Sequence, residues 1–393
     1  MAKKTKKPNF LTNLTIKNFR CFENFELKNL KRVNIFVGDN NSGKSSVLKA
    51  IEVLNPKFFK EKSHYLSQIL SLYYQFGPHG NGFIKSHQDI FEEHSIFFNN
   101  TNTKNKILIE GNFKSENKDS NDNFDIKFEN KIVDKIVNFP KKDFEQKNPE
   151  FFLEDTKEFK SIVATYQFSN KQNLLTLGVS SIGTYNDDIE NFEVFDVIFK
   201  GCEINSTKEI SANWNQILKK NGIAIEEKFV KLLQNFDRDI HAIRPHEDNL
   251  DFYKNNPINH QSPLVIPLDS MGEGFKRFFD IVITLELMNK NNKPQIICID
   301  EIDNGLYHDK QDLFWEQIIK LCEEYNIQLF ATTHSYDCMK SIVRVFENQY
   351  KTDEKIDEEL AVFRLVKIKN EVRARPFNFS LLKVMVESST EIR

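Results

Sequence analysis

The sequence lacks paired cysteines, and this limits both its compartment and its metal chemistry. Its five cysteines are scattered and form no Cys-x-x-Cys pair, and Cys298 lies in an apolar run where a thiol acts as a small hydrophobic side chain. A disulfide framework and a structural zinc site are therefore not expected, and the pattern fits a reducing cytoplasm. The cysteines are Cys21, Cys202, Cys298, Cys322 and Cys338.

The sequence also lacks the long apolar runs of membrane and secreted proteins. No stretch approaches the roughly 18 consecutive apolar residues that a membrane-spanning helix needs. The lysine-rich residues 3–7 are followed by no apolar segment, so we interpret them as a solvated tail rather than a signal peptide. With 39% hydrophobic and 28% charged residues, the chain is expected to be globular and to stay out of the membrane.

Neither sign of charge dominates, and no repeat is visible. A net charge of −3 provides no general attraction to nucleic acid, although it leaves a local basic patch and DNA binding open. Residues 56–260 contain no sustained heptads, which excludes a long coiled-coil arm.

What the sequence has instead is an alternation of apolar runs and amphipathic segments. Strands alternating with helices predict a mostly parallel α/β core, with the glycine-containing turn at residues 33–50 as its ligand-binding end. The predicted strands are two within 11–37 and others at 107–111, 124–128, 161–168, 264–268, 296–299 and 328–332. Helices are predicted from Ser45 and at 214–243, 274–288 and 312–325, a polar loop at 245–263, and a hairpin at 362–377 followed by one helix.

A glycine-rich pattern follows the buried run Val33–Val37. Residues 38–45 fit GxxxxGK[ST] without a gap, between a predicted strand and a predicted helix. Glycines let the backbone wind around phosphates, whose oxygens then accept from successive N–H groups at the positive end of the helix dipole. Lys44 is expected to reach the β- and γ-phosphates of ATP, and the Ser45 hydroxyl to hold Mg²⁺. The expected nucleotide-binding residues are Gly38, Asp39, Asn40, Asn41, Ser42, Gly43, Lys44, Ser45 and Ser46.

A second apolar run, at residues 296–299, ends in two acids. Such a buried strand delivers carboxylates to its carboxyl edge. There Asp300 is expected to meet Mg²⁺, and Glu301 to act as the general base that polarises the attacking water. Alone, the run could also be a strand that ends in a solvated acidic turn, but the phosphate-binding pattern favours the catalytic interpretation.

Two further segments are candidates for contact with phosphate. Ser270, Gly272 and Gly274 precede a long predicted helix, where a hydroxyl, free N–H groups and the helix dipole converge. A plain helix cap without a ligand is the alternative there. His334 follows the predicted strand 328–332, at the same sheet edge as Asp300, where an imidazole can donate to a γ-phosphate.

Together these motifs resemble the ABC-class ATPase heads, and most closely the AAA15 branch, whose relatives include the overcoming-lysogenization-defect (OLD) nucleases. The similar stretches cover roughly residues 11–55 and 264–345, on either side of a large insertion typical of such heads. They are Ile16-Lys17-Asn18-Phe19-Arg20-Cys21-Phe22, Ser270-Met271-Gly272-Glu273-Gly274, Asp300-Glu301-Ile302-Asp303-Asn304-Gly305-Leu306 and Thr332-Thr333-His334-Ser335.

The resemblance implies an ATP-closed homodimer or higher homo-oligomer. The signature residues Ser270, Gly272 and Gly274 of one chain would cap the γ-phosphate held by the P-loop (residues 38–45) of its partner. It also implies a catalytic base at Glu301 and a switch histidine at His334.

Two positions depart from the family pattern. Tyr307 stands where many ABC heads carry an aspartate of the D-loop, which leaves communication between the two sites open. The glutamine of the Q-loop has no clear counterpart, and Gln88 is only a weak candidate for it.

The implied architecture is an ATPase head with a mixed β-sheet core and a mainly helical insertion. Residues 1–55 would form the first part of the core, and residues 264–393 the second. Residues 56–263 would form the insertion, with a β-rich arm at about 105–170 and a helical lobe at about 205–245.

By resemblance, such a head regulates a separate effector. The segment after His334 is too short for the TOPRIM domain of OLD nucleases, and Asp237-Arg238-Asp239 matches its acidic motif only by coincidence. Stand-alone AAA15 heads are similar to the ATPase subunits of bacterial anti-phage modules such as PARIS, whose effector is a separate, nuclease-like protein. An SMC-like DNA-binding or repair ATPase is the alternative, and a transporter subunit is disfavoured because residues 270–274 do not read LSGGQ.

Overall fold

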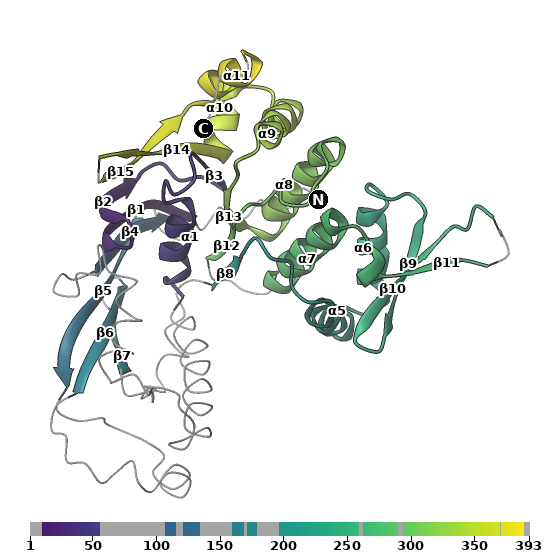
Figure 1. The fold of residues 1–393 in the computed structure, drawn as a ribbon, viewed down its shortest axis with the longest axis horizontal. Helices are drawn as coiled ribbons and strands as arrows, with labels where there is room; N and C mark the ends of the chain where they lie inside the picture. The colour runs from purple at the N-terminus through teal and green to yellow at the C-terminus, as the bar shows by residue number, and fades with distance from the viewer. Residues whose placement is uncertain are drawn as a thin grey trace, which may run out of the picture.

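The structure is a computed structural model, shown in Figure 1. It describes residues 10–55, 107–114, 121–133, 159–168, 171–178, 196–258, 262–289, 294–369 and 371–388. Gln88, the weak candidate for the Q-loop, lies outside the described residues.

A six-stranded core sheet in the order β15-β14-β3-β13-β12-β8 carries the site. All neighbouring strands are parallel except β14 and β15, which form the predicted antiparallel hairpin. Every residue of β3, β12 and β13 is buried, as expected for parallel strands covered on both faces. The mostly parallel α/β core is therefore confirmed. The strands are β3 (Val33–Val37), β8 (Asp196–Lys200), β12 (Gln295–Ile299), β13 (Ile327–Thr332), β14 (Leu360–Ile368) and β15 (Glu371–Phe377).

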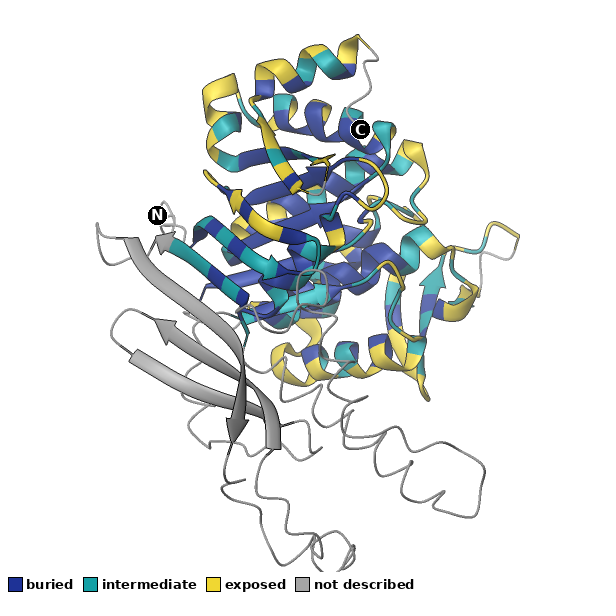
Figure 2. Cartoon of the chain, turned by 60° about the vertical axis from the view of Figure 1, so that its left-hand side comes forward, coloured by how far each residue is buried: buried dark blue, intermediate teal, exposed yellow. Residues whose placement is uncertain are grey.

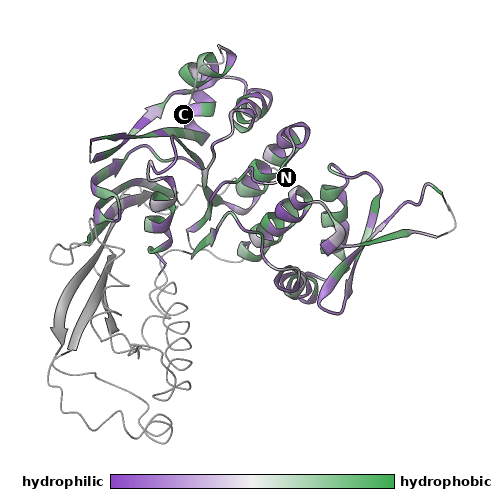
Figure 3. Ribbon diagram, viewed as in Figure 1, coloured by the Kyte–Doolittle hydropathy of each residue, from purple (hydrophilic) through white to green (hydrophobic). Residues whose placement is uncertain are grey.

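Side chains alternate between the two faces of this sheet, and each face packs against its own hydrophobic layer. Phe36 and Phe330 pack with α1 on one face, whereas Ile35 and Leu329 pack against the helices of the other. Figure 2 shows the buried strands between helices with exposed outer faces, and Figure 3 shows hydrophobic and hydrophilic stripes along these helices. The helices are α1 (Lys44–Glu52), α7 (Glu273–Met288), α8 (Gln311–Tyr325), α9 (Tyr336–Gln349), α10 (Asp353–Glu359) and α11 (Phe379–Glu387), with the short 3-10 helix η5 (His308–Lys310).

A second six-stranded sheet, in the order β2-β1-β4-β5-β6-β7, is antiparallel throughout. It contains the predicted strand pair at 107–111 and 124–128. Strands β1 and β2 of this sheet precede the P-loop, so the sheet joins the start of the chain to the predicted β-rich arm. Figure 1 shows β5 to β7 extending away from the core. The strands are β1 (Phe10–Phe19), β2 (Phe22–Leu27), β4 (Ile107–Lys114), β5 (Asn121–Val133), β6 (Phe159–Phe168) and β7 (Lys171–Gly178).

Residues 214–243 are not one helix. Helix α5 (Thr207–Asn221) ends at Gly222, whose φ of 67° leaves the helical region, and α6 (Ile223–Leu233) follows. The chain then enters strand β9 (Ile240–His246) instead of continuing the helix.

Residues 245–263 are not simply a polar loop. Strand β10 (Asn249–Lys254) lies between β9 and β11 (Leu264–Pro267), and its Leu250 and Phe252 are buried on alternate positions. This alternation of buried and less buried residues is too short to predict a strand from the sequence. Pairing with β9 and β11 stabilises β10 as a strand.

Much of the predicted insertion lies outside the described residues. Within 56–263 the described part contains strands β4 to β10 and helices α5 and α6. Strand β8, which falls in this range, pairs with β12 in the core sheet. Among the described residues, no helix combines the length and apolar character needed to cross a membrane.

Candidate active site

The loop between β3 and α1 has a backbone that requires glycine at two positions. Gly38 has φ of +141°, and a Cβ there would lie 2.5 Å from the Leu365 carbonyl oxygen of β14. Gly43 has φ of +97°, and a Cβ there would lie 2.9 Å from Cys21 Sγ. The loop therefore winds tightly into the amino end of α1, the arrangement that binds phosphate.

Strand pairing brings the two distant halves of the predicted site to one edge of the sheet, because β13 pairs in parallel both with β3, which precedes the loop, and with β12, which precedes Asp300. Lys44 is buried, and its Nζ donates to the carbonyl oxygens of Gly38 and Asp39, both at 2.8 Å. Burial lowers the pKa of Lys44, while the negative charges of Asp300, Asp39 and Glu301 oppose this shift. The ammonium group therefore lies in the electrostatic field of the Asp300–Glu301 pair.

The serines of the loop differ in their surroundings. Ser42 is buried, and its Oγ has no hydrogen-bond partner among the described residues. Ser45 is exposed at the start of α1, and Ser46 is half-buried. A buried hydroxyl without a partner is costly unless a ligand completes it, so this loop fits an oxygen-rich anion such as phosphate.

The acidic pair lies where β12 ends, as predicted. Asp300 is half-buried, and its backbone N–H donates to the Lys200 carbonyl at 2.8 Å. Glu301 is exposed and has a left-handed backbone with φ of 47°, an unusual conformation for a residue with a side chain. Such conformations cluster at functional sites, where the surroundings hold them in place.

Two side chains that sequence reasoning missed hold this turn. Arg277 Nη2 donates to the carbonyl oxygens of Asp300 at 2.7 Å and Glu301 at 3.1 Å. Thr332 Oγ1 donates to Asp300 Oδ1 at 2.5 Å and accepts from the Glu301 N–H at 2.8 Å. Two features of the sequence point to these residues. Thr332 lies two positions before the predicted switch histidine His334, and Arg277 interrupts an otherwise apolar face of the predicted helix 274–288.

The predicted signature segment forms the start of α7. Ser270 closes the short 3-10 helix η4 (Leu268–Ser270), and Gly272 caps α7; both are exposed. A Cβ on Gly274 would lie 2.5 Å from the Gly305 carbonyl oxygen, so the segment packs closely on the turn after Glu301. No bond between Ser270 and the P-loop is found among the described residues, so the structure does not join these two predicted parts within one chain.

The neighbouring Asp269 anchors this segment to the lobe formed by α5, α6 and β9 to β11. Its carboxylate accepts from Thr207 Oγ1 and from Asn249 Nδ2, the latter at 3.0 Å. Lys276 Nζ lies 3.5 Å from the Asp269 carbonyl oxygen. Asp269 therefore links the lobe to the residue that precedes Ser270.

The predicted switch histidine lies at the expected sheet edge. His334 lies two residues after the end of β13 and is half-buried, and β13 pairs in parallel with β12, which Asp300 follows directly. Tyr307, at the position of the D-loop aspartate, is 78% exposed.

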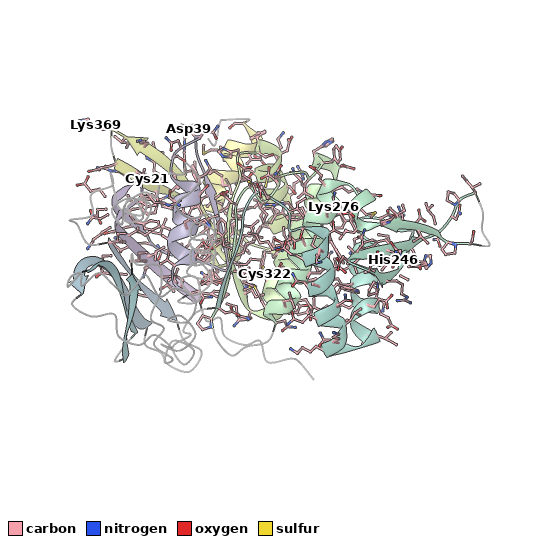
Figure 4. The ribbon with its side chains drawn as sticks, turned by 60° about the horizontal axis from the view of Figure 1, so that its bottom comes forward. Cys21, Asp39, His246, Lys276, Cys322 and Lys369 are labelled. Atoms are coloured by element: carbon pink, nitrogen blue, oxygen red, sulfur yellow. The ribbon has the colours of Figure 1, made fainter. Side chains whose placement is uncertain are left out.

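Arg20 is another residue that the sequence reasoning left without a role. It occupies the β1–β2 turn with φ of 50°, next to Cys21, whose Sγ contacts the Gly43 region of the P-loop. Burial lowers the pKa of Arg20, and the charges of Cys21 and Glu52 oppose this. Figure 4 shows Cys21, Asp39 and Lys369 at one end of the molecule, with His246 towards the other.

Most of the chain matches a known family of ATPase domains. The model of the AAA_15 family, described as an AAA ATPase domain, matches residues 10–339. An "ATP/GTP phosphatase" of Helicobacter pylori is 25% identical over 368 residues, which cover 86% of this chain and 89% of that protein. The "DNA replication and repair protein RecF" of Rickettsia felis is 45% identical over 47 residues, 12% of this chain and 13% of that one. The solved SMC head domain from Thermotoga maritima is similar at a TM-score of 0.43 and 13% identity, covering 93% of this chain and 98% of that one.

Proposed function

This chain belongs to the AAA_15 family of ATPase domains, and from that premise we propose that it is an ABC-type ATPase that closes a dimer around ATP and thereby regulates a partner protein. The observation that carries the proposal is the convergence of Lys44 with Asp300 and Glu301 at one edge of the core sheet, while Ser270 and Gly272 are exposed on a different element. Such a site can bind and hydrolyse ATP, and its exposed signature is available to a second copy.

The phosphates would be held by the P-loop. Backbone N–H groups at the start of α1 bind their oxygens, and Lys44 Nζ exchanges the Gly38 and Asp39 carbonyls for oxygens of the β- and γ-phosphates. The donors offered to a cation are oxygen atoms, the Ser45 hydroxyl and the Asp300 carboxylate, and Mg²⁺ prefers such donors. Bound there, Mg²⁺ would neutralise phosphate charge.

The hydrolytic step would depend on groups at the carboxyl edge of the sheet. Glu301 takes a proton from the attacking water, which becomes the nucleophile at the γ-phosphorus. His334 donates to a γ-phosphate oxygen, and Lys44 stabilises the charge that develops there. The bond to the β-phosphate breaks, so that ADP and inorganic phosphate leave.

Ser270, Gly272 and Gly274 would act on the ATP of the other chain. Their position at the amino end of α7 combines a hydroxyl, exposed N–H groups and the positive end of a helix of 16 residues. A two-fold dimer would use each signature once and each P-loop once.

Mixing two inactive variants tests this arrangement. Lys44→Ala removes the P-loop lysine but leaves the signature, whereas Ser270→Arg blocks the signature but leaves the P-loop. In a mixture, half of the dimers should combine both chains and contain one complete site. Hydrolysis should then rise to as much as about a quarter of the wild-type rate. A mixture no more active than its separate components would contradict a site shared between chains.

Regulation of a separate effector is the second part of the proposal. It is supported by the resemblance to ATPase subunits of anti-phage modules, in which a nuclease-like partner is held or released. The lobe that Asp269 connects to the signature provides a route by which nucleotide could influence a bound protein.

Co-purification with the products of neighbouring genes tests this second part. The tagged chain would be prepared with ATP, with ADP and without nucleotide, and the Lys44→Ala variant would serve as the control that cannot change state. A partner that is retained in one nucleotide state and lost in another is expected. A chain that remains alone in every state would contradict regulation of an effector and leave the ATPase assignment intact.

A further inference from the structure

The peptide group between Asp300 and Glu301 is held from both sides by side chains of other elements. Its carbonyl oxygen accepts from Arg277 Nη2 at 2.7 Å, and its N–H donates to Thr332 Oγ1 at 2.8 Å. Arg277 is 3% exposed and Thr332 fully buried, so the two side chains that hold the peptide are themselves shielded from water. This peptide carries the proposed cation ligand on one side and the proposed catalytic base on the other.

Arg277 connects the turn to the signature helix. It lies in the first turns of α7, and besides the Asp300 and Glu301 carbonyls it reaches those of Gly201 and Cys202, through Nη1 at 3.1 and 2.9 Å. A planar guanidinium can reach four carbonyls at fixed directions, which a lysine ammonium on a flexible stem cannot do. These hydrogen bonds of Arg277 therefore hold α7 in a defined position relative to the turn that carries Asp300 and Glu301.

Thr332 connects the same turn to the strand that carries His334. A hydroxyl has a single proton, which Thr332 donates to Asp300 Oδ1 at 2.5 Å, so its oxygen is free to accept from the Glu301 N–H. One side chain thus orients the carboxylate of Asp300 and the backbone of Glu301 together. Serine would preserve both bonds, and valine would preserve the shape but neither bond.

We propose that Arg277 and Thr332 are positioning residues that hold the Asp300–Glu301 peptide, and so aim the Glu301 carboxylate at the attacking water. They explain how Glu301 keeps a left-handed backbone that residues with a side chain rarely adopt. Two elements are thereby joined to the catalytic base: the signature helix, which would contact the γ-phosphate held by the other chain, and the strand of His334, which would contact the γ-phosphate held by this chain. This inference rests on the proposed function, in which Glu301 is that base.

Matched substitutions at Thr332 provide the first test. Thr332→Val should lower kcat for ATP by roughly 10–100-fold, the effect of a small misplacement of a reacting group, and should leave the Kd of a fluorescent ATP analogue unchanged. Thr332→Ser should recover most of the rate. Thr284→Val is the control, because Thr284 is also buried and its hydroxyl donates to the Asp280 carbonyl, within α7 at 2.8 Å. It should leave kcat unchanged.

Arg277→Lys tests the other side of the peptide. It retains the charge but cannot span all four carbonyls, so kcat should fall with little change in ATP binding. Thermal unfolding of each variant, compared with that of Thr284→Val, shows how much of any loss in kcat is due to a smaller folded fraction. Equal losses in kcat and in the folded fraction for both variants would overturn the proposal.

Combination with Glu301→Gln separates positioning from a general structural effect. If Thr332 and Arg277 act through Glu301, their substitution in the Glu301→Gln background should lower the residual rate by less than about threefold, because coupled residues are not additive. A full 10–100-fold further loss in that background would overturn the proposal. If Glu301→Gln alone retains the wild-type rate, the proposed function fails. If Glu301→Gln is slow but Thr332→Val and Arg277→Lys are not, only the present inference fails.

Discussion

Replacement of Lys44 with alanine is expected to abolish detectable nucleotide binding. Hydrogen bonds from a charged donor contribute about 1.5–3 kcal/mol each, so the loss of two to phosphate oxygens should lower affinity roughly 10²–10⁴-fold. Binding of a fluorescent ATP analogue would measure this directly. The ammonium is well placed for the role, because it is buried beside the P-loop backbone and within the field of Asp300.

The control for this prediction is a second lysine of the same helix. Lys49 bonds Glu52 at 2.8 Å and lies 3.4 Å above the centre of the Phe199 ring, so it has no role at the phosphates. Lys49→Ala should therefore retain ATP binding. Wild-type affinity in Lys44→Ala would show that the lysine contributes nothing to phosphate binding.

Replacement of Glu301 with glutamine should leave ATP binding intact and slow turnover by roughly 10²–10⁴-fold, the usual contribution of a general base. The amide keeps the shape of the carboxylate but cannot take the proton from water. Because ATP then persists, the variant should also accumulate as an ATP-bound dimer. Steady-state hydrolysis measures the first effect, and light scattering with ATP or ADP measures the second.

Glu316→Gln is the matched control, since it makes the same chemical change on an exposed position of α8. It should hydrolyse ATP at the wild-type rate. A Glu301→Gln protein as fast as this control would remove Glu301 from the mechanism. A slow variant that stays monomeric with ATP would retain the base but contradict the ATP-closed dimer.

Much of the fold followed from local patterns. The apolar runs of β3, β12 and β13 are continuous because parallel strands are buried on both faces, and such runs are visible without knowledge of their partners. The local sequence pattern does not predict strands β2, β7 and β8 or helices α9 and α10. Strand β10 was read as loop because its alternation of Leu250 and Phe252 is short and depends on pairing with β9 and β11.

The sequence alone determined the P-loop and the acidic pair, because each is a contiguous motif whose chemistry depends on neighbouring residues. Gly38 and Gly43 are needed by the backbone path of the loop itself, and Asp300 and Glu301 follow their strand directly.

Only the tertiary structure decided how the catalytic turn is held. Arg277 and Thr332 meet the Asp300–Glu301 peptide from two separate elements, and no periodicity along the chain encodes such a contact. The left-handed backbone of Glu301 is likewise maintained by these distant bonds rather than by a local preference for it.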